Sequence, residues 1–287
     1  MLNNTIVHSP ATVAEACQIL AARAGAIKVI AGGTDLMVLM NAGTLDAEEF
    51  LDIWGVDELR GITEDGPHLR LGALTTYTQL IRSPLIQQHA PALVAASRTI
   101  GAFQIQNRGT IGGNVVNASP AGDSLPVLVA SGAEIEIVST RGTRRVPVDQ
   151  FYEGYRRTVL QPDELVMAVK LPKLRSGERD FFYKVGTRRA QAISKVVMAA
   201  RARTAGNRIE SVHIGIGSVA PTVMRARATE TLLTGSTISP AIVEQARREI
   251  AREITPITDV RSTRHYRSRV TANLVSRLLR ELAGAAD

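Results

Sequence analysis

The stretch IKVIAGGTDLMVLM, residues 27–40, predicts a strand, a glycine turn and a helix in immediate succession. The strand is short and β-branched at Ile27–Ile30, and AGGTDL at 31–36 turns the chain into an apolar helical run. A second glycine-rich stretch carries TIGGN at 110–114 and SPAGD at 119–123. Together with further strands and helices along the chain, these units predict an α+β fold.

Each stretch contains a glycine pair, Gly32–Gly33 or Gly112–Gly113, at which main chain can approach a ligand closely. Thr34, Thr110 and Asn114 beside the pairs offer directed hydrogen bonds. Either pair alone is more often a tight turn, whereas two in one chain favour a cradle for a diphosphate. Neither pair fits G-x-G-x-x-G or G-x-x-x-x-G-K-[ST], which disfavours a Rossmann dinucleotide site and a nucleotide triphosphatase.

A polar segment with a glycine, Lys173–Asp180, is the best candidate for a linker. We therefore expect one domain at 1–175, with subdomains at about 1–55 and 56–175, and a second domain at 176–287. The second domain is predicted to contain a three-stranded antiparallel sheet and helices. The expected strands are Phe181–Gly186, Lys195–Arg203 and Arg208–Gly217, and the expected helices follow Ser239-Pro240 and begin near Ser262.

The 287 residues include one cysteine, Cys17, so this chain alone can form neither an internal disulfide nor a cysteine-ligated iron–sulfur cluster. Five histidines without paired-ligand spacing predict no metal site, and no obvious acid, base or nucleophile indicates a catalytic residue. The sequence shows neither a signal-peptide pattern nor a membrane-spanning apolar run. We expect a cytoplasmic protein.

The net charge of +7 is unevenly distributed. Residues 1–175 hold 15 Lys/Arg against 17 Asp/Glu, and residues 176–287 hold 19 against 10. The excess is dispersed, without a basic run longer than two residues, and only 4% of residues are aromatic. This pattern favours a solvated or subunit-facing surface over a nucleic-acid site.

The chain resembles the medium, FAD-binding subunits of the xanthine dehydrogenase and aerobic carbon monoxide dehydrogenase family of molybdenum hydroxylases. The resemblance rests on AGGTDL at 31–36, TIGGN at 110–114, SPAGD at 119–123, GSVAPTVMRARATETLLTG at 217–235 and DVRSTRHYRSRV at 259–270. It implies two N-terminal subdomains with the FAD fold of vanillyl-alcohol oxidase-like flavoproteins, followed by a small C-terminal domain.

The resemblance also implies which residues bind FAD. On the diphosphate and ribityl region it places Ala31, Gly32, Gly33, Thr34, Asp35, Leu36, Thr110, Ile111, Gly112, Gly113 and Asn114. Asp123 would accept hydrogen bonds from FAD hydroxyls or its amine, and Lys184 would reach the flavin from the C-terminal domain. Without the resemblance, Asp123 would be interpreted as a helix cap and Lys184 as a solvated strand lysine.

One departure from the family pattern concerns the segment after the paired arginines, where members commonly carry an acidic residue near the flavin. Here the segment contains Gln191 and Ala192. Our hypothesis is that a less negative surround favours anionic reduced flavin, which raises the flavin potential and disfavours NAD as acceptor.

By resemblance, the chain is an electron-transfer subunit whose partners are a large subunit with a molybdenum cofactor and a small subunit with 2Fe-2S clusters. A dimer of heterotrimers is the expected assembly. The acceptor stays open among NAD, a quinone, a cytochrome and oxygen, and the substrate is set by the large subunit. The alternatives are a self-contained FAD-dependent oxidase and a basic, cofactor-free scaffold or nucleic-acid-binding module.

Overall fold

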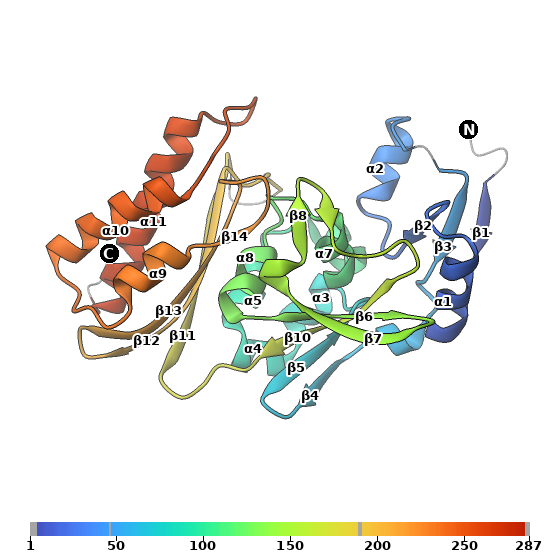
Figure 1. The fold of residues 1–287 in the computed structure, drawn as a ribbon, viewed down its shortest axis with the longest axis horizontal. Coiled ribbons are helices and arrows are strands. Elements are labelled where there is room, and N and C mark those ends of the chain that lie inside the picture. Colours follow the sequence, from blue (N-terminus) through green and yellow to red (C-terminus); the bar gives the residue numbers. More distant parts are fainter. Residues whose placement is uncertain (1–4, 46, 189–190, 285–287) are drawn as a thin grey trace.

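Three sheets follow one another along the long axis of the molecule, in sequence order from one end to the other (Figure 1). They contain three, five and four strands, and a separate two-stranded hairpin accompanies the middle sheet. This computed structural model describes residues 5–45, 47–188 and 191–284. The mixture of helices and sheets is the predicted α+β class.

The N-terminal sheet is parallel, in the order β1-β3-β2. The strand, turn and helix predicted from residues 27–40 are all present. Helix α1 begins where the Thr12 hydroxyl accepts a hydrogen bond from the Glu15 amide at 3.1 Å, and its buried face includes Cys17. The elements are β1 (Ile6–His8), α1 (Val13–Ala22), β2 (Ile27–Ile30), α2 (Leu36–Asn41) and β3 (Glu49–Asp52).

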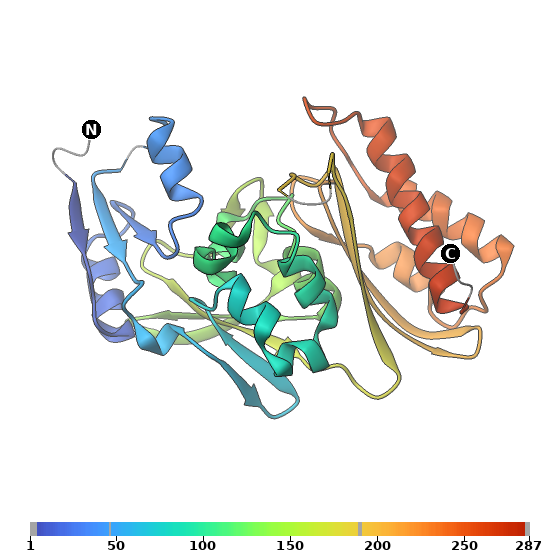
Figure 2. The same ribbon diagram turned by 180° about the vertical axis from the view of Figure 1, so that it is seen from behind.

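The middle sheet is antiparallel, in the order β4-β5-β10-β6-β7, and helices cover one of its faces (Figure 2). The strands are β4 (Ile62–Asp65), β5 (His68–Gly72), β6 (Glu134–Ser139), β7 (Gly142–Pro147) and β10 (Leu165–Pro172). The helices are α3 (Tyr77–Arg82), α4 (Pro84–His89), α5 (Pro91–Ser97), α6 (Phe103–Arg108), α7 (Ile111–Asn117) and α8 (Leu125–Ser131). Shorter elements are the 3-10 turns η1 (Asp57–Leu59) and η2 (Val148–Gln150) and the hairpin β8 (Tyr152–Gly154) with β9 (Arg157–Thr158).

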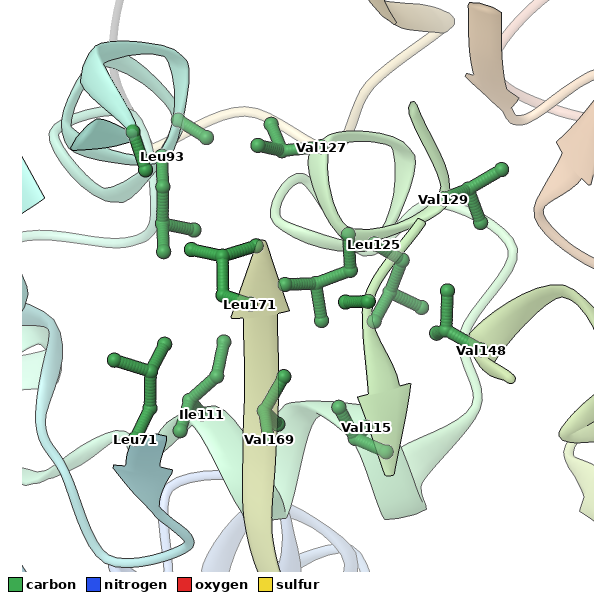
Figure 3. Close-up of a cluster of buried hydrophobic side chains, with 14 of the residues drawn as sticks. Leu71, Leu93, Ile111, Val115, Leu125, Val127, Val129, Val148, Val169 and Leu171 are labelled. Atoms are coloured by element: carbon green, nitrogen blue, oxygen red, sulfur yellow. The ribbon is translucent and has the colours of Figure 1, made fainter. Parts of the chain in front are cut away.

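The main hydrophobic core lies between this sheet and its helices (Figure 3). Leu71, Val169 and Leu171 project from the strands toward Ile111 on α7 and Leu125 on α8. Because all five side chains are essentially excluded from water, their burial supplies the dominant stabilising term for this part of the chain. It also fixes α7, which carries the second glycine pair.

The C-terminal sheet corrects one prediction, because it has four strands where three were expected. The additional strand β14 contains only two residues and pairs with Gly215 and Ile216 at the edge, so it is too short for any alternation to be visible in the sequence. The strands are β11 (Glu178–Val185), β12 (Val196–Ala205), β13 (Arg208–Gly217) and β14 (Met224–Arg225). The helices α9 (Arg227–Leu233), α10 (Pro240–Glu253) and α11 (Arg264–Leu282) cover its outer face (Figure 1).

The inner face of this sheet packs directly on α8 of the middle part. A methyl group on Gly215 would lie 2.1 Å from the Pro126 carbonyl oxygen, and one on Gly217 would lie 2.7 Å from that of Pro120. Neither position can therefore carry a side chain without displacing backbone. Glycine at both positions brings the C-terminal sheet against the segment that contains SPAGD.

The predicted linker is shorter than expected, because residues from Glu178 onward already belong to β11. Asp180 receives hydrogen bonds from Arg201 on β12 at 2.8 and 3.1 Å, and the same guanidinium donates to the Pro172 carbonyl at 2.9 Å. The two side chains are only 3% and 6% exposed. Through Arg201, this buried pair links the end of β10 to strands β11 and β12 of the C-terminal sheet.

Substituting Asp180→Asn should lower the free energy of unfolding by about 3 kcal/mol, because it leaves a buried guanidinium without its counter-charge. Urea denaturation measures the change. Glu210→Gln is the matched control, since Glu210 pairs with Arg203 at a solvent-exposed position of the same sheet and should change stability by less than about 1 kcal/mol. Equal effects of the two substitutions would contradict this role of the buried pair.

Candidate cofactor site

A cavity of about 1330 Å³ opens where the three parts of the chain meet. This volume exceeds that of an ordinary drug-sized ligand site and suits a dinucleotide. Among the predicted site residues, its wall includes Ala31, Gly32, Gly33, Thr34, Asp35, Leu36, Thr110, Gly112, Gly113, Asn114 and Asp123. Ile111 and Lys184 do not line it: Ile111 lies in the core, and Lys184 lies behind Asp123.

The first glycine stretch contacts the second through backbone. A methyl group on Gly32 would lie 1.8 Å from the Arg108 carbonyl oxygen at the end of α6. Gly33 has φ +75°, a left-handed conformation that favours glycine. Glycine is therefore required at position 32 by the close approach of the Arg108 carbonyl, and it is favoured at position 33 by the backbone conformation.

The second glycine pair is helical rather than part of a loop. The Thr110 hydroxyl accepts a hydrogen bond from the Gly113 amide at 3.1 Å and thereby begins α7. The Gly112 amide donates to the Ala73 carbonyl at 2.9 Å, and a methyl group on Gly112 would lie 2.7 Å from Ala73. The absence of a side chain lets α7 lie on the end of β5 beneath the cavity.

Asn114 presents hydrogen-bond donors to the cavity because its oxygen is already engaged. The Ser124 hydroxyl donates to Asn114 Oδ1 at 2.7 Å. This hydrogen bond fixes the orientation of the amide, so its nitrogen is the end left for a ligand. Ser124 is fully buried outside the cavity wall, and no motif in the sequence indicates this role.

Asp123 and Lys184 form a buried ion pair, with Lys184 Nζ 2.5 Å from Asp123 Oδ2. Lys184 also donates to the Thr99 carbonyl at 3.1 Å, and the Ser194 hydroxyl donates to Asp123 Oδ1 at 2.5 Å. Burial raises the pKa of Asp123, an effect that Lys184 opposes. Both simple interpretations are wrong: Asp123 does not cap α8, and Lys184, with 7% exposure, is not solvated.

A stack of cations on the single tryptophan flanks the first glycine loop. The Arg108 guanidinium lies 3.7 Å and that of Arg60 4.7 Å from the centre of the Trp54 ring, and Arg60 donates to the Trp54 carbonyl. The stack holds the end of α6, whose carbonyl meets Gly32. Arg108 is too far from Trp54 in the sequence for any local pattern to reveal their contact.

Within the part of the chain that the structure describes, no group of three or more His, Cys, Asp or Glu side chains is arranged to hold a metal ion. Over the same residues, no helix has the length and apolarity required to span a bilayer.

Comparison with known proteins identifies the cofactor. Residues 3–174 match the family described as “FAD binding domain in molybdopterin dehydrogenase”, and residues 181–282 match the “CO dehydrogenase flavoprotein C-terminal domain”. The chain belongs to the family of FAD-binding subunits of molybdenum hydroxylases. The family resemblance noted in the sequence is thereby confirmed, and the chain is an oxidoreductase flavoprotein subunit.

Several known FAD-binding subunits are similar to this chain over nearly the full length of both proteins. A putative xanthine dehydrogenase FAD-binding subunit of Escherichia coli is 33% identical, covering 97% of this chain and 96% of the relative. The carbon monoxide dehydrogenase medium chain of Hydrogenophaga pseudoflava is 30% identical, covering 95% and 94%. A solved structure of carbon monoxide dehydrogenase from that organism superposes with a TM-score of 0.94 at 29% identity, covering 99% of both chains.

The residues around the cavity fit FAD. The main chain of Gly32, Gly33, Gly112 and Gly113 lines the cavity, where it can approach a diphosphate, and Asn114 offers amide donors. Assignment of individual residues to parts of FAD stays a prediction, because the comparisons concern whole domains.

Substituting Gly32→Ala should weaken FAD binding by more than about tenfold, because the new methyl group forces the two glycine stretches apart. FAD titration of the apo chain, followed by flavin fluorescence, measures the dissociation constant. Gly55→Ala is the control, since a methyl group there meets nothing within 4 Å. If both variants bound FAD equally well, the close approach would not matter for the site.

Ser124→Ala should raise the dissociation constant for FAD by about three- to tenfold, because the amide of Asn114 loses the hydrogen bond that orients it. Ser131→Ala is matched to it, since Ser131 ends the same helix and its hydroxyl donates only to backbone carbonyls of Val127 and Leu128. The same titration measures both variants. A larger loss of affinity for Ser131→Ala would be inconsistent with this orientation of Asn114.

Proposed function

We propose that this FAD subunit receives electrons from 2Fe-2S clusters on a small partner subunit and passes them to an external acceptor. The substrate would be hydroxylated at a molybdenum cofactor on a large subunit. The observation that carries the proposal is the combination of an FAD-family cavity with a chain whose one cysteine, Cys17, is buried on α1. Such a chain cannot ligate a cluster itself.

FAD would supply the redox chemistry, accepting and returning electrons singly or in pairs. The chain's own residues would bind and orient it. We assign Ala31–Leu36 and Thr110–Asn114 to the diphosphate and ribityl region, supported by their shared place in the cavity wall and by the contact of Gly32 with the chain just before Thr110. Asp123 would accept from FAD hydroxyls or the amine, since each carboxylate oxygen keeps a second lone pair beside its bond to Lys184 or Ser194.

The proposed assembly is a heterotrimer, doubled, in the cytoplasm. Two relatives are named the medium chain of carbon monoxide dehydrogenase and the medium subunit of nicotine 6-hydroxylase. These names support the proposal that a larger and a smaller subunit accompany the chain. Division of the chain into domains at 1–175 and 176–287 is supported by a distinct C-terminal core whose members all lie after the connector, while Ala199 and Val223 of the same part join the core of the middle sheet. The C-terminal domain, with most of the positive charge, is the proposed subunit-facing part.

Native isolation tests the assembly. We expect the chain to co-purify with two further subunits, and with molybdenum and iron in fixed proportion to FAD, as measured by elemental analysis. A chain that binds FAD but isolates alone, without either metal, would support a self-contained flavin oxidase. A colourless chain that takes up no FAD would overturn the cofactor assignment too.

The structure places Gln191 and Ala192 in the cavity wall, where the family commonly has an acidic residue. Ala192→Asp should lower the flavin midpoint potential by a few tens of millivolts, because a nearby negative charge disfavours anionic reduced flavin; about 30 mV corresponds to 1.4 kcal/mol for a two-electron couple. Spectroelectrochemical titration measures the shift.

The control for this substitution is Ala251→Asp, which adds the same charge on the exposed face of α10, away from the cavity. It should leave the potential unchanged. If Ala192→Asp also left it unchanged, the missing carboxylate would not set the flavin potential.

A further inference from the structure

Arg267, in the first turn of α11, is a buried arginine that the sequence did not mark as functional. It is only 3% exposed, yet it lines the cavity. One terminal nitrogen donates to the carbonyls of Lys195 at 2.7 Å and Ser218 at 2.9 Å, and the other donates to Asp259 Oδ1 at 2.8 Å. A buried guanidinium with three such acceptors is held in one orientation.

The three acceptors come from three separate segments of the C-terminal cavity wall. Lys195 follows wall residues 191–194, Ser218 begins the wall segment after β13, and Asp259 lies in the segment between α10 and α11. Arg267 is therefore the common donor through which these three segments meet.

Ser218 extends this network into the FAD-binding part. Its amide donates to the Pro120 carbonyl at 2.7 Å, and its hydroxyl donates to the Ser194 carbonyl at 2.9 Å. Ser194 in turn donates to Asp123. Ser218 has φ +65°, a left-handed conformation that a serine adopts only when its surroundings impose it. The hydrogen bond from Arg267 is one of the contacts that impose it.

Asp259 completes the network as an ionised partner. Burial raises its pKa, but hydrogen bonds from the Arg261 and Ser262 amides and from Arg267 outweigh this effect, so the pKa of Asp259 lies below its ordinary value. The carboxylate thus holds the backbone turn at Arg261 and Ser262 and supplies the counter-charge of the Arg267 guanidinium. The Nε–H of Arg267, by contrast, is buried and has no acceptor among the described residues.

We propose that Arg267 is the positioning residue of the C-terminal wall of the FAD cavity: its guanidinium holds residues 195, 218 and 259 in the arrangement that FAD binds. The inference rests on FAD occupying this cavity. Lysine could not replace arginine here, because a single ammonium cannot reproduce a planar fork that donates in several fixed directions.

The test uses the full chain with Arg267→Lys and Arg267→Met, and with Arg269→Met as the control on an exposed position of the same helix. Three quantities are measured: the dissociation constant for FAD, the visible absorption spectrum of bound FAD, and the melting temperature without FAD. FAD binding by the unsubstituted chain checks the cofactor assignment separately.

We expect Arg267→Lys to fold, to bind FAD about tenfold more weakly and to shift the visible flavin band, since at least one charge-assisted hydrogen bond is lost at the wall. Arg267→Met should lose at least as much affinity; if it fails to fold, the lysine variant alone decides. Arg269→Met should behave as the unsubstituted chain. The proposal is overturned if Arg267→Lys keeps the original affinity and spectrum, or if Arg269→Met loses as much.

Discussion

Close approach of backbone to backbone is the constraint on which the cavity depends. Gly32 meets the Arg108 carbonyl, Gly112 meets Ala73, and Gly215 and Gly217 meet carbonyls of the segment around α8. At each of these contacts a single methyl group would force main chain apart. Three sheets with largely separate cores can therefore surround one cavity only because these positions carry no side chain.

Buried polar groups then fix how the C-terminal sheet faces that cavity. The ion pair of Asp123 and Lys184 joins the SPAGD segment to β11, and Arg267 reaches the same segment through Ser218. Such pairs contribute little net stability compared with apolar packing, but they specify one arrangement, because leaving either partner unpaired is costly. Because the reduction potential of a flavin depends on the groups around it, a cavity wall with one fixed arrangement suits this cofactor.

Much of the fold followed from local sequence. The strand and helix around AGGTDL, the capped helix starts at Thr12 and Ser239 and the turn between β12 and β13 are local features, and the structure has them all. The two-residue strand β14 was missed because it carries no periodicity. The helical state of Gly112–Gly113 was missed because glycine has a low intrinsic helix propensity, which the cap at Thr110 and packing on Ala73 override here.

The site was predictable only in part. The other predicted residues of both glycine stretches line the cavity, whereas Ile111 turns into the core and Lys184 is paired with Asp123 outside the cavity wall; their contacts with FAD stay predictions. The roles of Ser124 and Arg267 could not be inferred, since each depends on contacts between segments distant in sequence. Trp54 and Arg108 are another such pair.

We propose above that electrons reach this flavin from a partner subunit. Anaerobic stopped-flow absorbance of the flavin tests it most directly, comparing the purified complex with the FAD-loaded chain alone. Purines, N-heterocycles, aldehydes and carbon monoxide serve as candidate reductants. We expect at least one of them to bleach the flavin in the complex and none of them to bleach the flavin in the isolated chain. Bleaching of the isolated chain at the rate of the complex would contradict it.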